Sequence, residues 1–237
     1  MNWYKQAQQE IQVSRSKVKS FLASNNFDGL SGYLYECITR NFSGVQEAQK
    51  KLADPKFNLL RDKYNSIVST AKPSNNPGWA QWDIQKSLQQ TSGDMKLYFS
   101  PLNNDVEKFI NGLQNLYQIL VPISTKYNCN IDFKIPTTLS SYLGLNDKLI
   151  VHFSNQQATR EINQIISNWG KSYGITFGQR THSIGQDIGG KSYGERISEQ
   201  ISNYSKQYLE SKKYNVDQIT DWVLLYFNKL LTNVGGS

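Results

Sequence analysis

The sequence predicts an α+β fold, in which helices pack on one face of a mostly antiparallel sheet and an N-terminal helical region precedes it. Three observations lead to this class. Residues 1–72 show helical periodicity without strand patterns, and residues 79–234 alternate strand-like and helical segments. Several links between strand-like segments are also short, which favours antiparallel pairing. We therefore predict an N-terminal helical region over 1–72 and an α+β domain over 79–234.

Helical periodicity defines the first region. Apolar residues recur at helical spacing over residues 3–23, 30–38 and 56–68. The segment Lys72–Gly78 contains two prolines, two asparagines and a glycine, and it is the clearest break in the chain. The predicted domain boundary lies there.

Strands and helices alternate after this break. Strands are expected near Trp82 and Ile84 and over 95–100, 131–135 and 148–153, with a short one at 175–177. Apolar stripes predict helices over 105–120 and 155–169, introduced by Asn104 or Asp105 and by Asn155 as capping residues. Two helices over about 193–209 and 216–231 end the domain.

Alternation along the strands places polar side chains on one face of the sheet. In strand 95–100, Lys96 and Tyr98 lie opposite the apolar set, and in strand 131–135 Asp132 and Lys134 do the same. Strand 148–153 contributes Lys148 and His152 to that side. Two interpretations remain open: a solvated face on which lysines prevent aggregation, or a site for acid–base chemistry on an anion. Crowding among Lys96, Lys134 and Lys148 would lower the pKa of a lysine base.

The charge and composition of the chain limit which kinds of partner are expected. The net charge of +7 favours anionic partners, yet the basic residues are scattered and form no nucleic-acid motif. Nucleic acid is therefore not the expected partner, and no stretch is apolar enough for a membrane span. No secretory signal is visible at the N-terminus. We expect a cytoplasmic protein or an effector secreted without a classical signal peptide.

Cysteine and histidine usage gives little support for a cofactor. Cys37 and Cys129 are predicted to be buried or half-buried free thiols, and two histidines without a Glu or Cys at ligand spacing make a weak metal site. The loop Gly185–Ser192 matches a phosphate-loop pattern literally, but no buried strand precedes it. We interpret it as a loop leading to a helix N-terminus that suits an anion, with Arg180 and Arg196 nearby.

Four short motifs carry a resemblance to a known family. They are Lys96-Leu-Tyr98 on one strand, Asn130 to Ile135 with Lys134, the apolar strand Asp147 to Phe153, and Ser192-Tyr-Gly194-Glu-Arg196. In their order and spacing, they resemble Hop-A-type effectors of type III secretion. Relatives of that family include phosphothreonine lyase effectors and the lyase components of class III–V lanthipeptide biosynthesis. The resemblance covers about two-thirds of the chain, from residue 79 onward.

The resemblance implies a phospho-Ser/Thr lyase that eliminates phosphate from a peptide without a metal or other cofactor. Lys134 would remove the Cα proton. Tyr98 stands where the family has its acid, a histidine, so that Tyr98 or His152 would protonate the leaving phosphate. The phosphate would be held by four cations, namely Lys96, Lys148, Arg180 and Arg196.

One departure from the family leaves an alternative open. The family carries an arginine between its last two motif strands, and residues 136–148 have no counterpart. A non-catalytic effector or peptide-binding subunit is therefore the second hypothesis. For the lyase, the substrate would be a lanthipeptide-type precursor or a host protein, and a separate kinase is left open as a partner.

Overall fold

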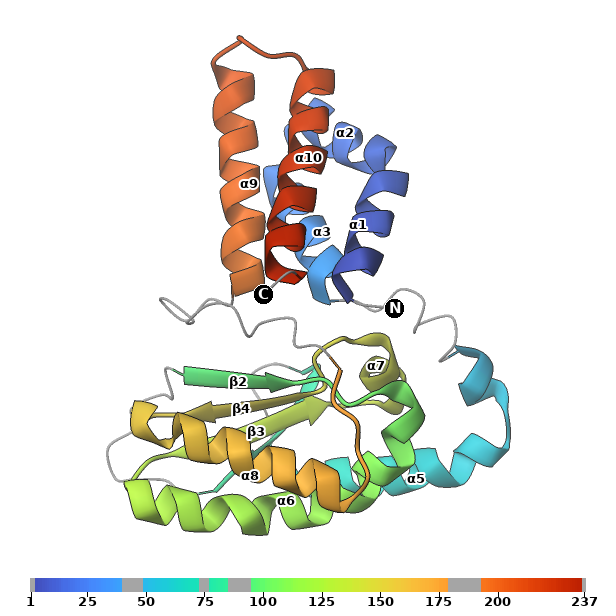
Figure 1. The fold of residues 1–237 in the computed structure, drawn as a ribbon. Helices are drawn as coiled ribbons and strands as arrows, with labels where there is room; N and C mark the ends of the chain where they lie inside the picture. Colours follow the sequence, from blue (N-terminus) through green and yellow to red (C-terminus); the bar gives the residue numbers. More distant parts are fainter. Residues whose placement is uncertain (1–2, 40–48, 73–76, 85–94, 179–192, 236–237) are drawn as a thin grey trace. The chain divides into compact units, whose positions relative to one another are not determined.

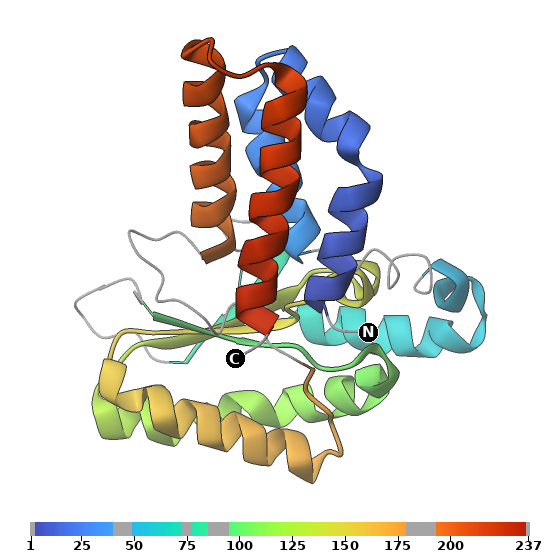
Figure 2. The same ribbon diagram turned by 45° about the horizontal axis from the view of Figure 1, so that its top comes forward.

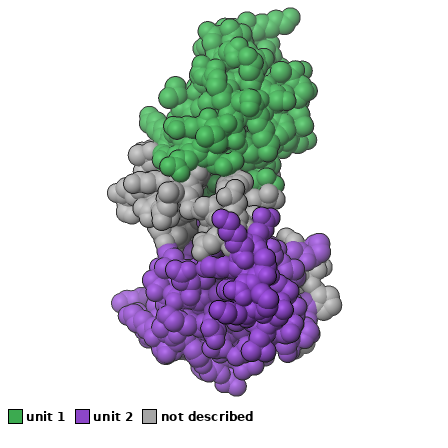
Figure 3. All heavy atoms as spheres, turned by 90° about the vertical axis from the view of Figure 1, so that its right-hand side faces the viewer, with its two compact units in different colours: residues 1–42, 188–237 green, residues 43–187 purple. Residues whose placement is uncertain are grey.

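The chain forms two compact units in a computed structural model that describes residues 3–39, 49–72, 77–84, 95–178 and 193–235 (Figure 3). One unit, which we call the helical unit, comprises residues 1–42 and 188–237. The other, the sheet unit, comprises residues 43–187. An antiparallel sheet with packed helices, preceded along the chain by N-terminal helices, confirms the α+β class.

This division differs from the predicted boundary within Lys72–Gly78. The helices α9 (Tyr193–Glu210) and α10 (Val216–Gly235) pack with the N-terminal helices, although they follow the sheet in sequence. The physical reason is that their apolar faces complete the core of the helical unit: α9 packs on α3 (Phe27–Thr39) and α10 on α1 (Trp3–Val13). Periodicity reveals such faces but not which distant segments they contact.

An aliphatic core holds the helical unit together. The predicted helix 3–23 is two helices, α1 and α2 (Arg15–Ala23), with Ser14 between them. Ser202 on α9 donates a hydrogen bond to the carbonyl of Phe27 at 2.6 Å and so links the two ends of the chain. The buried cluster consists mostly of Ile, Leu and Val and contains Ile11, Val18, Leu22, Leu30, Tyr33, Leu34, Cys37, Ile38, Ile197, Ile201, Ile219, Val223, Phe227 and Leu231.

Four strands form the sheet: β1 (Trp79–Asp83), β2 (Met95–Phe99), β3 (Ile131–Pro136) and β4 (Leu149–Phe153). Their order across the sheet is β1-β3-β4-β2, and all three pairings are antiparallel. The predicted segment 175–177 contributes only an isolated bridge between Phe177 and Pro101.

Two helices cover one face of this sheet, α6 (Val106–Tyr127) and α8 (Thr159–Ser172), as Figures 1 and 2 show. The face they cover carries the apolar set of each strand, as the alternation predicts. From α8 the predicted stripe of Ile162, Ile166 and Trp169 is buried in this core. The second face of the sheet thus carries the polar residues.

Aromatic side chains close the core at one end of the sheet. The helix α5 (Lys56–Val68) places Tyr64 there, and its hydroxyl donates to the Pro136 carbonyl at 2.6 Å. The short helix α7 (Leu139–Gly144), which the periodicity does not predict, adds Tyr142, whose ring lies 5.0 Å from that of Phe109. All three aromatic side chains are fully buried.

Candidate functional site

The strand register assembles the predicted polar residues into two rows across the sheet. Lys96 on β2 is paired with His152 on β4, and His152 with Asp132 on β3. In the second row, Tyr98 is paired with Ile150, and Ile150 with Lys134. We call Lys96, Tyr98, Asp132, Lys134 and His152 the polar face. Three strands that are far apart in sequence thus bring five reactive side chains together.

His152 lies at the centre of the polar face, between the two lysines. Burial, followed by the positive charges of Lys134 and Lys96, lowers its pKa from 6.5 to about 3. Its Nε2 is buried and has no hydrogen-bond partner among the described residues. The imidazole is therefore neutral at neutral pH, and it stands in a positive field that would attract an anion.

Asp132 pairs directly with His152 across the two central strands. Burial, and then the negative charge of Asp83, raises its pKa from 3.8 to about 7, while Lys134 acts in the opposite direction. Its Oδ1 is buried without a hydrogen-bond partner in the described part of the chain. A carboxyl group in this state can hold a proton at neutral pH. Sequence alternation places Asp132 on this face, but did not mark it as catalytic, because its burial depends on neighbouring strands.

Lys134 extends from β3 toward β1. Its Nζ lies 5.3 Å from the ring centre of Trp79, a cation–π distance. On the same strand β1, Asp83 accepts a hydrogen bond from Lys72 at 3.1 Å and lies opposite Asp132 in the register. The Trp79 ring therefore restricts where the Lys134 amine can lie.

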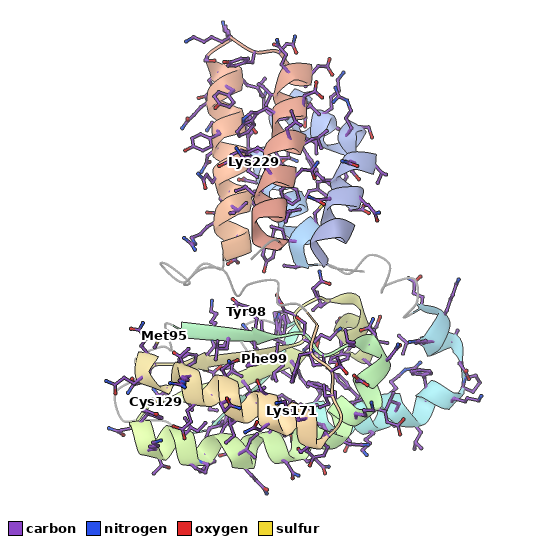
Figure 4. The ribbon with its side chains drawn as sticks, viewed as in Figure 1. Met95, Tyr98, Phe99, Cys129, Lys171 and Lys229 are labelled. Carbon is purple, nitrogen blue, oxygen red and sulfur yellow. The ribbon has the colours of Figure 1, made fainter. Side chains whose placement is uncertain are left out.

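The polar face is less open at its centre than the sequence indicates. Tyr98 and Ile150 are only 8% and 6% exposed, although neither belongs to the helix-covered core. Tyr98 and its neighbour Phe99, labelled in Figure 4, leave β2 on opposite faces. Tyr98 is thus a buried phenol, in contrast to the solvent-exposed one that an open sheet face would give.

Lys148, the third predicted strand lysine, does not join the polar face. It precedes β4, so the strand alternation does not govern its side chain. Its Nζ donates to the Pro101 carbonyl at 2.7 Å and lies 5.4 Å from the ring centre of Tyr142, in the helix-side core. Burial lowers the pKa of Lys148 to about 8. The structure therefore gives Lys148 a partner other than a bound phosphate.

The predicted arginines cannot be added to the polar face. Arg180 and the loop Gly185–Ser192 lie outside the described residues. Arg196 lies on α9 and belongs to the helical unit. The described cations of the polar face are therefore Lys96 and Lys134.

The described residues hold no metal site, and their cysteines are unpaired. No group of three or more His, Cys, Asp or Glu side chains able to hold a metal occurs in these ranges. Cys37 and Cys129 are buried free thiols, as predicted, and burial raises the pKa of Cys37 to about 12. None of the described helices has the length and apolar character needed to span a membrane.

Comparisons with family models, curated proteins and solved structures give no match to this chain. The resemblance to the lyase-containing effector family therefore rests on the four quoted motifs and on their order.

Proposed function

We propose that the polar face binds a phosphorylated serine or threonine of a peptide and eliminates its phosphate to leave a dehydroamino acid. The observation that carries this proposal is the placement of Lys96 and Lys134 around His152, whose pKa both lysines lower. Two cations around a neutral, half-buried imidazole form a site that attracts a dianion such as a phosphate monoester.

In the proposed reaction, Lys134 acts as the base. Its neutral amine takes the Cα proton, and the electron pair of the C–H bond forms the Cα=Cβ double bond. The Cβ–O bond breaks, and phosphate leaves with the electron pair of that bond. Lys96 holds the phosphate through charge-assisted hydrogen bonds. The leaving oxygen gains a proton from an acid, for which the resemblance offers Tyr98 or His152.

The substrate class follows from the proposed chemistry. The reacting residue needs a hydrogen on Cα and a phosphate on Cβ, which are found in phosphoserine and phosphothreonine. A lanthipeptide-type precursor and a host signalling protein both meet this requirement, and a separate kinase would supply either one.

A binding subunit without catalysis is the second proposal, and one observation favours it. Tyr98, which stands at the position of the family's acid, is 8% exposed. A phenol held in this way is a poor proton donor compared with a histidine. A protein that has lost catalysis would keep Lys96 and Lys134 as phosphate ligands.

Mass spectrometry of phosphoserine and phosphothreonine peptides incubated with the protein tests the proposal. The expected product is lighter than the unphosphorylated peptide by one water molecule. Lys134→Met should lower the rate by about 10²–10⁴-fold, the usual contribution of general base catalysis. The matched control is Lys171→Met, because Lys171 is an exposed lysine on α8, which covers the opposite face of the sheet (Figure 4).

The outcomes separate the two proposals. If the Lys134→Met variant eliminates phosphate as fast as the wild-type protein does, Lys134 is not the base. Phosphopeptide binding without elimination, weakened by Lys96→Met and Lys134→Met, would support the binding subunit. A protein that neither binds nor converts phosphopeptides would contradict both.

A further inference from the structure

Asp132 and His152 form a half-buried pair whose orphaned polar atoms the proposed base and phosphate ligands do not explain. Their Cα atoms are partners in the β3–β4 register, so the two side chains are neighbours on the polar face. Asp132 Oδ1 and His152 Nε2 are both buried and both lack a hydrogen-bond partner within the described ranges. Buried polar atoms are rarely left in this state, and such exceptions often mark functional sites.

We propose that Asp132, next to His152, is the acid that protonates the leaving phosphate. This inference rests on the proposed elimination and assigns the group that the resemblance leaves undecided. As the Cβ–O bond breaks, the carboxyl O–H bond of Asp132 breaks and a new O–H bond forms on the phosphate oxygen. Asp132 becomes a carboxylate, Lys134 becomes an ammonium, and the products are the dehydroamino acid and hydrogen phosphate.

The surroundings of Asp132 favour this role over its alternatives. Among described residues, the charged and titratable groups on this side of the sheet are Lys134 from β3, Lys96 and Tyr98 from β2, His152 from β4, and Asp83 from β1 with its ion-pair partner Lys72. Burial and Asp83 together raise the pKa of Asp132 to about 7, which suits a general acid at neutral pH. His152, in contrast, is already deprotonated at that pH because its pKa is about 3.

A bound phosphate dianion would strengthen this arrangement. A negative charge beside Asp132 raises the pKa of the carboxyl group further, because it disfavours the carboxylate. The inference therefore predicts that substrate binding above pH 7 takes up a proton, which then leaves with the phosphate. The source of the transferred proton would be Asp132 in each turnover.

Calorimetry with phenyl phosphate measures this proton uptake without turnover, since phenyl phosphate is a monoester whose aromatic ring has no acidic C–H bond to support elimination. Titrations at pH 8 in two buffers of different ionisation enthalpy give the number of protons bound. We expect an uptake approaching one proton for the wild-type protein and for His152→Gln. Asp132→Asn should bind phenyl phosphate with an uptake near zero.

The elimination assay completes the test. Asp132→Asn should lower kcat by about 10²–10⁴-fold, while Asp62→Asn, which changes an exposed carboxylate on α5, serves as the matched control. The kcat/KM profile of the wild-type protein should fall as pH rises through about 7. Asp83→Asn removes the repulsion that raises the pKa of Asp132 and should move this limb to lower pH, even if Asp132→Asn does not fold.

Two results would overturn the inference alone. One is elimination by a folded Asp132→Asn protein at the wild-type rate, and the other is a high-pH limb of the kcat/KM profile that Asp83→Asn leaves in place. In both cases the wild-type lyase activity stands. Failure of the wild-type protein to bind phenyl phosphate and phosphopeptides would instead overturn the proposed function and the inference together.

Discussion

The two units differ in which polar groups they bury. Among the described residues of the helical unit, the buried polar side chains are serine and threonine hydroxyls. Ser205 and Thr220 donate to carbonyls of their own helices at 2.8 and 2.7 Å, whereas the hydroxyl of Ser198 has no partner in the described ranges. The sheet unit instead buries carboxyl and ammonium groups, namely those of Asp105, Asp147 and Lys148. Buried hydroxyls with local partners cost little, whereas buried charges need specific partners and change with pH. The buried carboxyl and ammonium groups of the described residues therefore lie in the sheet unit.

The largest expected effect is the loss of stability when a buried aromatic side chain is removed from either core. Phe109 in the sheet unit and Phe227 in the helical unit are both fully buried, each in its own cluster. Phe109→Ala and Phe227→Ala should each lower the free energy of unfolding of their own unit by about 3–5 kcal/mol. Hydrogen exchange resolved by segment would measure this. Equal loss of protection in both units for either variant would show that the cores unfold as one.

The next largest effect is on the pH dependence of stability, which should change in opposite directions for two substitutions on the polar face. In Asp132→Asn, His152 remains with its pKa lowered from 6.5 to about 3, so the unfolded chain binds a proton that the folded one does not. Stability relative to wild type should then fall as pH falls below 6.5. In His152→Gln, Asp132 remains with its pKa raised from 3.8 to about 7, and stability should fall as pH rises across that range.

Each of these slopes approaches roughly 1.4 kcal/mol per pH unit, the value for one proton. In the wild-type protein the two contributions nearly cancel between pH 4 and 6.5, because the folded pair holds its proton on Asp132 and the unfolded pair on His152. Urea unfolding at a series of pH values measures the slopes. Parallel curves for both variants and the wild type would contradict the pKa shifts.

Two glycines in helices give a smaller contrast between the units. A methyl group on Gly112 in α6 would lie 2.8 Å from the Trp169 ring, whereas one on Gly32 in α3 would meet no atom within 4 Å. Gly112→Ala should therefore destabilise the sheet unit by about 1–3 kcal/mol. Gly32→Ala should stabilise the helical unit by about 0.4–1 kcal/mol. Denaturation of each variant, followed by circular dichroism, determines the sign.

The smallest expected effect concerns an exposed ion pair of the helical unit. Lys19 donates to Asp217 at 2.7 Å and, together with Arg15, lowers the pKa of that carboxyl group. A lowered pKa stabilises the fold above the ordinary carboxyl pKa, and this contribution is lost as pH falls. Asp217→Asn should have less effect than any change above, and salt should remove it. A salt-independent loss would indicate a packing role.

The sequence predicts the strands and their faces well because alternation has a period of two and one face is buried. It predicts neither α7 nor its cap, in which Thr138 accepts a hydrogen bond from the Ser141 amide at 3.0 Å, since six residues are too few for helical periodicity. The placement of Lys134 beside His152 follows from the register between β3 and β4. Neither the turn residues nor the alternation along each strand determines that register. Burial of Asp132 likewise depends on strands brought together only by folding.

The helical unit combines the two ends of the chain, and this has a consequence during synthesis. Its first three helices leave the ribosome before the whole sheet unit, while α9 and α10 emerge after it. At about 5–20 residues per second, the delay is on the order of 10 s. During that time Leu30 and Leu34 on α3 have no α9 to cover them, whereas the sheet unit can already fold. A chaperone that binds exposed apolar helices would therefore find its target in the segment of the nascent chain that precedes the sheet unit.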